Sequence, residues 1–443
     1  MSLKLLSKLK RSLNYPRLIY LLKDSCKKDL NQTILIIFYI RDVQGLGEKK
    51  IAKEMLQWLM INYPPKFQKI LPFIPIFGRW DDLLYFFPNI TQLSSLEYVN
   101  SNYLSNINEK KLQEIIKTQN KVVKFFCDTL KRDLENMNKA KNITLLAKWA
   151  PSEYSSKDNK YNLVETICNY MKISPRIYRK RYLTPLRKYL KIVERNMCAK
   201  KWDKIDYDLI PSKARLNLHY AFIRNDNKRY LSHKFNRKQN ITPKYAHQII
   251  HNYAYAIKIN PIIEKQWDNF INKINNNFEN LRVCVDTTSS MYIRKNNKKY
   301  LFNRFFLDVG ISIALVMAHF TKTVSNFSKI ITFEEKSSLI YKITSLNKLG
   351  PPSENKLSKI IKKFENFKII IITTQKIDLN NYKNLSIINW VISDEPLQII
   401  KDNNLTIVHG FSTVILKTLL NEQDISYELI LKNISKDSRY SIL

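Results

Sequence analysis

The spacing of the apolar residues changes near residue 280, and this change constrains the fold more than any other feature of the sequence. Before it, apolar side chains recur at helical spacing, as in IAKEMLQWLM (51–60) and LQEIIKTQNKVVKFFCDTL (112–130). After it, short apolar runs such as LRVCVD (281–286) and KIIIITT (368–374) alternate with amphipathic stretches. Residues three or four apart share one helix face, whereas a strand buried on both faces reads as a continuous apolar run. The sequence therefore predicts a helical part followed by an α/β part.

These two parts are expected to be separate domains. The predicted boundary lies in the polar stretch INKINNNFEN (271–280), which gives a basic α-helical domain, 1–278, and an α/β domain, 279–443. Prolines separate the helical segments of the first domain, and no exact repeat is visible, so an irregular solenoid of helical hairpins is favoured. In the second domain the alternation of strands and helices predicts a mainly parallel, doubly wound, Rossmann-like sheet.

Individual elements follow from the same spacing. The expected strands are LRVCVD (281–286), SKIITF (328–333), SLIYKI (338–343), KIIIITT (368–374), LSIINWVIS (385–393) and LTIVHGF (405–411). The expected helices of the second domain are FNRFFLDVGISIALVMAHF (302–320), ENKLSKIIKKF (354–364) and STVILKTLL (412–420). In the first domain YLTPLRKYLKIVERNM (182–197) is expected to form one helix, because its apolar residues recur at helical spacing.

Net charge limits the partners of this chain. Seventy-four Lys and Arg against 38 Asp and Glu give a formal charge of +36, and residues 171–244 alone hold 21 basic and 5 acidic residues. A solvated face usually mixes both signs, so a region of one sign needs a polyanion to offset its self-repulsion. RNA or another nucleic acid is therefore the expected partner, with an anionic membrane surface as the alternative.

The densest positive segment is the basic block, which we define as residues 176–201. Its candidate nucleic-acid-binding residues are Arg176, Arg179, Lys180, Arg181, Arg187, Lys188, Lys191, Arg195, Lys200 and Lys201. The four from Arg187 to Arg195 recur at helical spacing and are expected to share a helix face. Tyr178, Tyr182 and Tyr189 lie between the cations and could stack on unpaired bases. The alternative is a solvated helix whose tyrosines pack inward.

No catalytic constellation is visible, so the protein is expected not to be an enzyme. The GLG stretch (45–47) followed by two lysines lacks the full spacing of a phosphate-binding loop, and a tight turn capped by its last glycine is favoured. Asp81 and Asp82 precede an apolar run and are expected to act as N-cap and first-turn acids. His247 and His251 lie four apart on an expected helix, without an evident third metal ligand.

The cysteines and apolar runs bear on the compartment. Five cysteines occur without a CxxC pair, which favours a reducing environment over a disulfide framework or a zinc site. The longest wholly apolar run, ILIIFYI (34–40), is far shorter than the roughly 20 residues that span a bilayer. The stretch 1–13 lacks the apolar core of a signal peptide and reads as a basic amphipathic helix. An intracellular, cytoplasmic protein with no transmembrane segment is therefore expected.

Several stretches resemble a family of plant and giant-virus proteins that is catalogued as a domain of unknown function. They are RDVQGLGEKK (41–50), FGRWDDLLYF (77–86), LLAKWAPSE (145–153), the segment 178–212, VDTTSSM (285–291), INWV (388–391) and HGFS (409–412). This family combines a TROVE-like helical part with a C-terminal von Willebrand A-like domain, and it is related to the Ro ribonucleoprotein autoantigen.

The resemblance implies a HEAT-like, TROVE-type solenoid or ring in 1–278 and a von Willebrand A-type sheet in 279–443. Because the Ro relatives bind structured and misfolded small RNAs, it also implies a non-enzymatic RNA-binding protein whose basic helical platform is closed by a degenerate A-like domain. The alternative is a viral structural or assembly protein that is packaged in the virion and contacts nucleic acid or acidic viral or host proteins.

The resemblance also points to a metal site at the end of the first strand. In von Willebrand A domains an Asp-x-Ser-x-Ser loop, a second-loop Thr and a third-loop Asp hold Mg²⁺ through hard oxygen ligands. Asp286, Thr288 and Ser290 match the first loop, and Ser353 falls near the second-loop position. TTQ (373–375) stands where the third-loop Asp is expected, which weakens the attraction for a dication. No resident cofactor is therefore expected. Capping of the following backbone by Asp286 is favoured over a bound Mg²⁺.

Overall fold

The computed structural model describes residues 5–6, 14–42, 45–87, 108–155, 158, 161–210, 212–236, 246–253, 259–272, 274, 280–291, 293–294, 302–303, 305–327, 329–334, 336–347, 354–375, 377–382, 384–393, 397–410 and 413–443. By compactness the chain divides into a sheet unit, Met1–Glu48 with Gln239–Leu443, and a helical unit, Lys49–Lys238. This division differs from the predicted cut at residue 278, because helices from both ends of the predicted first domain group with the sheet. Of the expected helix at 1–13, only Leu5 and Leu6 lie within the described residues.

The helical unit contains no strand among its described residues. Its longest helix, α10 (Glu109–Asn138), begins where the Asn108 side chain accepts a hydrogen bond from the backbone N–H of Lys111 (2.9 Å). The other α-helices are α4 (Lys49–Asn62), α5 (Pro64–Ile70), α6 (Ile74–Phe77), α7 (Trp80–Leu83), α11 (Leu146–Trp149), α13 (Leu163–Met171), α14 (Pro175–Ile177), α15 (Thr184–Tyr189), α16 (Val193–Cys198) and α17 (Ser212–Asn236). Helix α10 packs against α5 and α13 and buries apolar residues at helical spacing, among them Val122 and Phe126. The helices predicted at 51–60 and 112–130 are confirmed.

The stretch 182–197 is divided, so the predicted single helix is wrong. A π-helical turn (Tyr178–Leu183) runs into α15, and α16 begins only at Val193. Between them Lys191 has a left-handed backbone (φ 49°), and its N–H donates to the carbonyl of Lys188 (3.0 Å). A left-handed residue closes the helix that precedes it. Glycine usually marks this position, so a lysine there gave no signal of a helix end.

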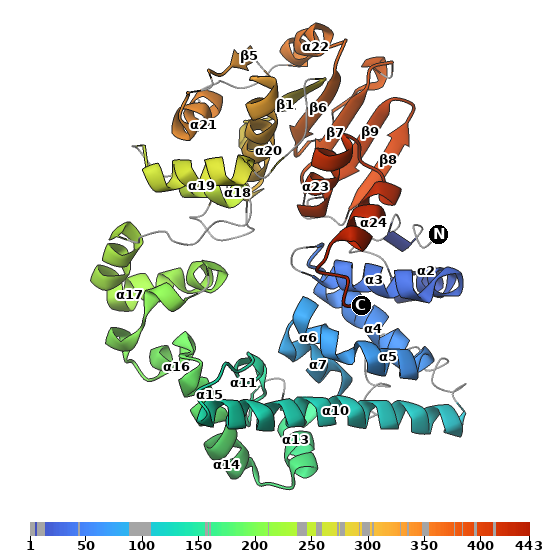
Figure 1. Ribbon diagram of the computed structural model, residues 1–443, viewed down its shortest axis with the longest axis vertical. Coiled ribbons are helices and arrows are strands. Elements are labelled where there is room, and N and C mark those ends of the chain that lie inside the picture. The colour runs from blue at the N-terminus through green and yellow to red at the C-terminus, as the bar shows by residue number, and fades with distance from the viewer. Residues whose placement is uncertain are drawn as a thin grey trace. The chain divides into compact units, whose positions relative to one another are not determined.

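Among its described residues, the sheet unit contains a central sheet of seven strands in the order β5-β4-β1-β6-β7-β9-β8. Figure 1 labels all of these except β4. They are β1 (Leu281–Val285), β4 (Thr323–Asn326), β5 (Lys329–Thr332), β6 (Lys368–Thr373), β7 (Ile387–Val391), β8 (Gln398–Asp402) and β9 (Leu405–His409). Strands β4, β1, β6, β7 and β9 are parallel, while β5 and β8 pair antiparallel at the two edges. A separate antiparallel pair joins β2 (Ile293–Arg294) and β3 (Phe302–Asn303). The mainly parallel sheet is as predicted.

The helices of the sheet unit come from both ends of the chain. They are α2 (Tyr15–Lys28), α3 (Leu30–Arg41), α18 (Ala246–Tyr253), α19 (Pro261–Ile271), α20 (Phe305–Thr321), α21 (Leu339–Asn347), α22 (Glu354–Lys363), α23 (Thr413–Glu422) and α24 (Tyr427–Lys436). Helix α18 lies against α20, which in turn contacts β1 and β4 (Figure 1). In the described part of the chain, every helix is too short or too polar to span a bilayer.

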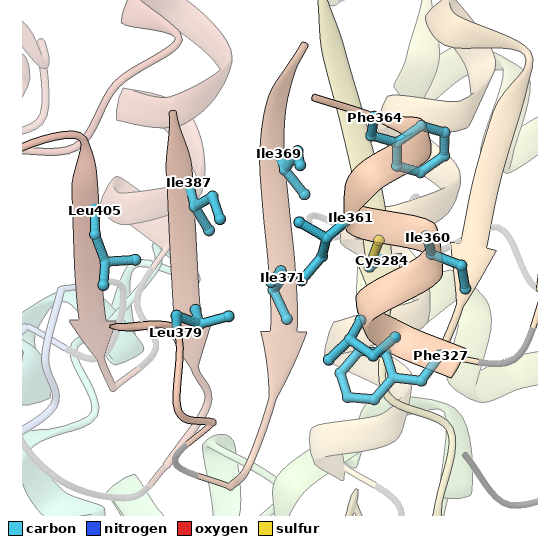
Figure 2. Packing of buried hydrophobic residues seen from close by; sticks show 11 residues of the cluster. Cys284, Phe327, Ile360, Ile361, Phe364, Ile369, Ile371, Leu379, Ile387 and Leu405 are labelled. Carbon is cyan, nitrogen blue, oxygen red and sulfur yellow. The ribbon is translucent and has the colours of Figure 1, made fainter. Parts of the chain in front are cut away.

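One core cluster of the sheet unit joins α22 to the strands (Figure 2). Ile361 of α22 and Phe364, in the turn that follows the helix, pack with Ile369 and Ile371 of β6 and with Ile387 of β7. Burying a side chain of this size contributes about 1.5–3 kcal/mol. The apolar runs of these strands are therefore explained by burial on the faces of a central sheet.

The stretch SLIYKI (338–343) forms the start of α21, so its prediction as a strand is wrong. Leu339, Ile343 and Leu346 are buried, whereas Tyr341 is 58% exposed. The buried positions 339, 343 and 346 follow helical spacing. This spacing is visible only over a window longer than the six residues that suggested a strand. Of the strands that were not predicted, β4 and β8 are short or largely exposed and carry weak apolar patterns. The other two, β2 and β3, are two residues long, and β3 occupies the start of the expected helix at 302–320.

Residues 45–47 of the RDVQGLGEKK motif lie in a tight turn after the end of α3. A Cβ atom on Gly45 would lie 2.0 Å from the carbonyl oxygen of Tyr39, so only glycine fits there. Gly47 has a left-handed backbone (φ 69°), and its N–H donates to the carbonyl of Asp42 (2.8 Å). The predicted turn with Gly47 as its cap is confirmed.

Asp42 of the same motif joins α3 to the last residues of the chain. Its carboxylate is fully buried and accepts hydrogen bonds from Arg439 (Nη2 to Oδ1, 2.8 Å) and from the Tyr440 hydroxyl (2.9 Å). The Arg439 Nε lies 2.6 Å from Oδ2. Burial, reinforced by the Asp42 charge, raises the pKa of Tyr440. We call this three-residue network the Asp42 clasp.

Candidate nucleic-acid interface

The basic block lies on the surface of the helical unit. It runs through α14, the π-helical turn, α15 and α16, and nine of its ten cations are exposed. The tenth, Arg187, is partly buried. Glu194 is the single acidic residue between 176 and 201. The block therefore presents charge of nearly one sign to solvent.

Arg187 is held by the protein itself. Its guanidinium donates to the carbonyls of Ala147 and Ala150 and to the hydroxyl of Ser152, each at 2.9 Å. Burial lowers the pKa of this arginine below its usual value. These bonds join α15 to α11 and to the turn that follows it, so the geometry gives Arg187 a structural role in addition to its charge.

Lys188, Lys191 and Arg195 do not share the face of one helix, because the chain turns at Lys191. They nevertheless line one cavity of about 410 Å³, which we call the basic cavity. Among the described residues that line it, the basic ones are Lys148, Arg187, Lys188, Lys191, Arg195 and Lys204, and the acidic one is Asp206. The tertiary structure thus brings these cations together by a turn instead of a continuous helix.

The remaining lining of the basic cavity is mainly aliphatic. Leu190, Ile192, Val193, Ile205 and Ile210 contribute to it, and Leu145 and Leu209, each 54% exposed, lie at its edge. Pockets of roughly 300–1,000 Å³ with an apolar lining and a few converging polar groups are typical ligand sites. The cations attract the phosphate groups of a ligand, and the aliphatic walls provide a packing surface for its apolar part.

The tyrosines of the block are mostly unavailable for stacking. Tyr178 and Tyr182 are 1% and 8% exposed, and the Tyr178 hydroxyl donates to the carbonyl of Pro151 (3.1 Å). Burial raises the pKa of Tyr178. Tyr189 is 41% exposed, and its hydroxyl donates to the carbonyl of Lys141 (3.0 Å). Inward packing, the alternative given above, is confirmed for the first two.

Asp81 and Asp82 belong to a second, buried cluster in the helical unit. Both lie in the first turn of α7, as predicted, but the N-cap residue is Arg79 and not an aspartate. The backbone N–H of Arg79 donates to the Asp82 side chain (3.0 Å). Lys49 lies 3.0 Å from Asp81, and Lys53 lies 3.3 Å from Asp82. Burial lowers the pKa of Lys53 to about 8 against the opposing attraction of Asp82. The cluster joins α4 to α7 and is a structural ion network of paired charges.

Asp286 lies at the carboxyl end of β1, beside the end of β6. Its buried carboxylate accepts hydrogen bonds from the Thr288 backbone N–H (2.9 Å) and hydroxyl (2.7 Å) and from the hydroxyls of Ser290 (2.9 Å) and Thr373 (3.0 Å). The predicted capping contact is therefore present. Thr373 occupies the strand end at which the resemblance implied a carboxylate, and Ser353 lies outside the described residues.

Millimolar Mg²⁺ should leave the melting temperature nearly unchanged. Among Asp286, Thr288, Ser290 and Thr373 only one side chain carries a negative charge, and it is already satisfied by four donors. Stabilisation by a ligand depends on its concentration relative to Kd, so weak binding adds little. Thermal melts with MgCl₂ or with NaCl of equal ionic strength test this. A rise specific to Mg²⁺ that disappears in Asp286→Ala would contradict it.

His247 and His251 both lie on α18, as expected. His251 Nδ1 is 2.7 Å from the Asp308 carboxylate, and burial lowers the pKa of His247 to about 4. Among the described residues, no three His, Cys, Asp or Glu side chains are arranged to hold a metal ion. The contact of His251 with Asp308 joins α18 to α20.

The chain is similar to one described domain family and to a viral protein. Residues 110–176 and 169–277 match a family described as a domain of unknown function (DUF2828). The chain is also 26% identical over 340 residues to Uncharacterized protein L728 of Acanthamoeba polyphaga mimivirus. That match covers 70% of this chain and 55% of the viral protein, so the chain spans about half the length of this relative. The expected likeness to a domain of unknown function and to a giant-virus protein is confirmed, and the family match includes the whole basic block.

Proposed function

We propose that the protein binds RNA without catalysing a reaction, and that the basic block contacts RNA phosphates. The observation that carries this proposal is that six cations and one acid, Asp206, line the basic cavity among the residues that the structure describes. Arginine and lysine at such density offset the charge of a polyanion.

We further propose that the helical part is of the HEAT-like, TROVE type and that the sheet is of the von Willebrand A type. The strand order is consistent with this, since the sheet reverses its winding between β1 and β6. Asp286 and Thr373 lie at that point, where doubly wound sheets place their ligand sites. The hydroxyl-lined Asp286 would then be a remnant of a metal site.

Replacing Lys188, Lys191 and Arg195 together by Gln should weaken binding to single-stranded RNA and flatten its salt dependence. Each lost phosphate contact lowers the log–log slope by roughly 0.7, so three contacts lower it by about 2. At roughly 0.1 M salt this corresponds to an affinity about 100-fold lower. All three side chains are exposed, so the fold should be retained. Fluorescence anisotropy over a series of salt concentrations measures both quantities.

A matched variant on α10 separates this effect from general charge. Lys110, Lys117 and Lys131 are exposed residues of the same unit, and changing them to Gln removes the same total charge. We expect this variant to keep most of its affinity and slope. Equal losses in both variants would show diffuse attraction, and no loss in the block variant would place any RNA site elsewhere.

A further inference from the structure

Tyr154 is the most exposed large hydrophobic side chain in the described part of the helical unit. Its exposed fraction is 85%, whereas Tyr178 and Tyr182 are buried. It follows the APSE segment of the LLAKWAPSE motif and lies outside the basic block. An aromatic ring left largely in water gains little from packing, so its position is not explained by the stability of the core.

The backbone of Tyr154 is also in a conformation that favours glycine. Its φ is 61°, in a turn closed by the Ser155 N–H, which donates to the Ser152 carbonyl (3.1 Å). The Asp158 carboxylate accepts from the Tyr154 N–H (3.2 Å) and helps to hold this turn. A bulky residue in the left-handed region is an uncommon choice, and such outliers concentrate at functional sites.

Tyr154 borders a second cavity, of about 380 Å³, which we call the tyrosine cavity. Arg179 and Thr184, both exposed, line it together with Glu153 and Arg187. Arg179 belongs to the π-helical turn, a conformation that is frequent at functional sites. The wall that Arg187 forms is held by its three hydrogen bonds to 147–152.

From this juxtaposition we infer that Tyr154 is a stacking platform for one unpaired base of a bound RNA, with Arg179 holding a neighbouring phosphate. This inference rests on the proposed function and adds the class of substrate, single-stranded or looped RNA. Aromatic rings accept any base, because every base has a π face, whereas paired bases are already stacked. Glu153 disfavours a phosphate inside the cavity and offers an acceptor to a base amino group.

The test uses a short single-stranded RNA that contains 2-aminopurine, and the same strand paired with its complement. The wild-type protein should prefer the single strand. It should also quench the 2-aminopurine fluorescence, because stacking on an aromatic ring quenches this base. Tyr154→Phe should retain both properties. Tyr154→Ala and Tyr154→Gly should lose the quenching and bind roughly 5- to 150-fold more weakly, with an unchanged salt slope. Tyr220→Ala is the control, because Tyr220 is an exposed tyrosine (60%) of α17 in the same unit.

Stability measurements separate stacking from a structural role. Glycine suits the positive φ, so Tyr154→Gly should melt at the wild-type temperature or above it. A melting temperature several degrees lower would make Tyr154 a structural residue and overturn the inference. The inference also fails if Tyr154→Ala binds and quenches as the wild type does. If the Lys188, Lys191 and Arg195 variant then still loses salt dependence, the proposed function stands without the inference. If the wild-type protein binds neither the single-stranded RNA nor the duplex, both the inference and the proposed function are overturned.

Discussion

Replacing Asp42 by Ala should lower the free energy of unfolding of the sheet unit by about 3–4 kcal/mol. The substitution leaves the Arg439 guanidinium and the Tyr440 hydroxyl without their shared carboxylate, at a site where Asp42 is fully buried and Tyr440 is 4% exposed. Removing one partner of a buried ion pair typically costs about 3–5 kcal/mol. Arg439 is 31% exposed, which favours the lower part of that range.

Hydrogen exchange measured by mass spectrometry suits this prediction, because the chain contains two units and need not unfold in one step. Peptides from α3 and from the last residues of the chain should lose protection together in Asp42→Ala. The control is Glu422→Ala, which breaks the ion pair with Lys432 (3.0 Å) on the surface of the same unit. Such pairs contribute about 0–1 kcal/mol. If the two variants exchange alike, the clasp does not stabilise the unit.

Replacing Arg187 by Ala should destabilise the helical unit by about 2–4 kcal/mol. Two backbone carbonyls, of Ala147 and Ala150, and the Ser152 hydroxyl lose their donor. A part-buried acceptor left without a partner costs about 1–3 kcal/mol, more when the lost donor was charged. Arg187→Lys should recover little of this stability, because one ammonium group cannot reproduce the planar fork that reaches three acceptors.

Thermal melts and exchange of the 146–155 peptides measure this effect. The control is Lys188→Ala, an exposed neighbour that should change stability by less than about 0.5 kcal/mol. The pair also separates structure from RNA binding. Lys188→Ala should alter the salt slope, whereas Arg187→Lys should act through stability. If Arg187→Ala melts as Lys188→Ala does, the three hydrogen bonds are not important for the fold.

Much of the fold could be predicted because the spacing of apolar residues is a local property. The apolar runs formed the strands β1, β6, β7 and β9, and the periodic stretches formed the helices α10, α20 and α22. Each of these segments contains its own pattern. The predictions were wrong where the apolar pattern was short or where no residue indicated the end of a helix. SLIYKI matched a strand only over six residues, and Lys191 closed a helix without the glycine that usually marks such an end.

The candidate interface was predictable in composition but not in arrangement. Ten cations with one acid between residues 176 and 201 are visible in the sequence, and nine of these cations are exposed. Helical spacing predicted that Arg187 and Lys188 share one exposed face. In the fold, however, the Arg187 guanidinium contacts the 147–152 segment. The exposed aromatic next to the block is Tyr154, which the sequence did not distinguish from other tyrosines.

By itself, the sequence determined the order of helical and α/β elements, the mainly parallel sheet and the strong positive charge of the surface. Only the tertiary structure decided which charged side chains are buried and which face solvent. Asp42 and Arg439 are 397 residues apart, and no local pattern connects them. The physical reason is that apolar spacing is set by neighbours along the chain. The burial of a charge, by contrast, is stable only when a distant segment supplies its hydrogen-bond partner.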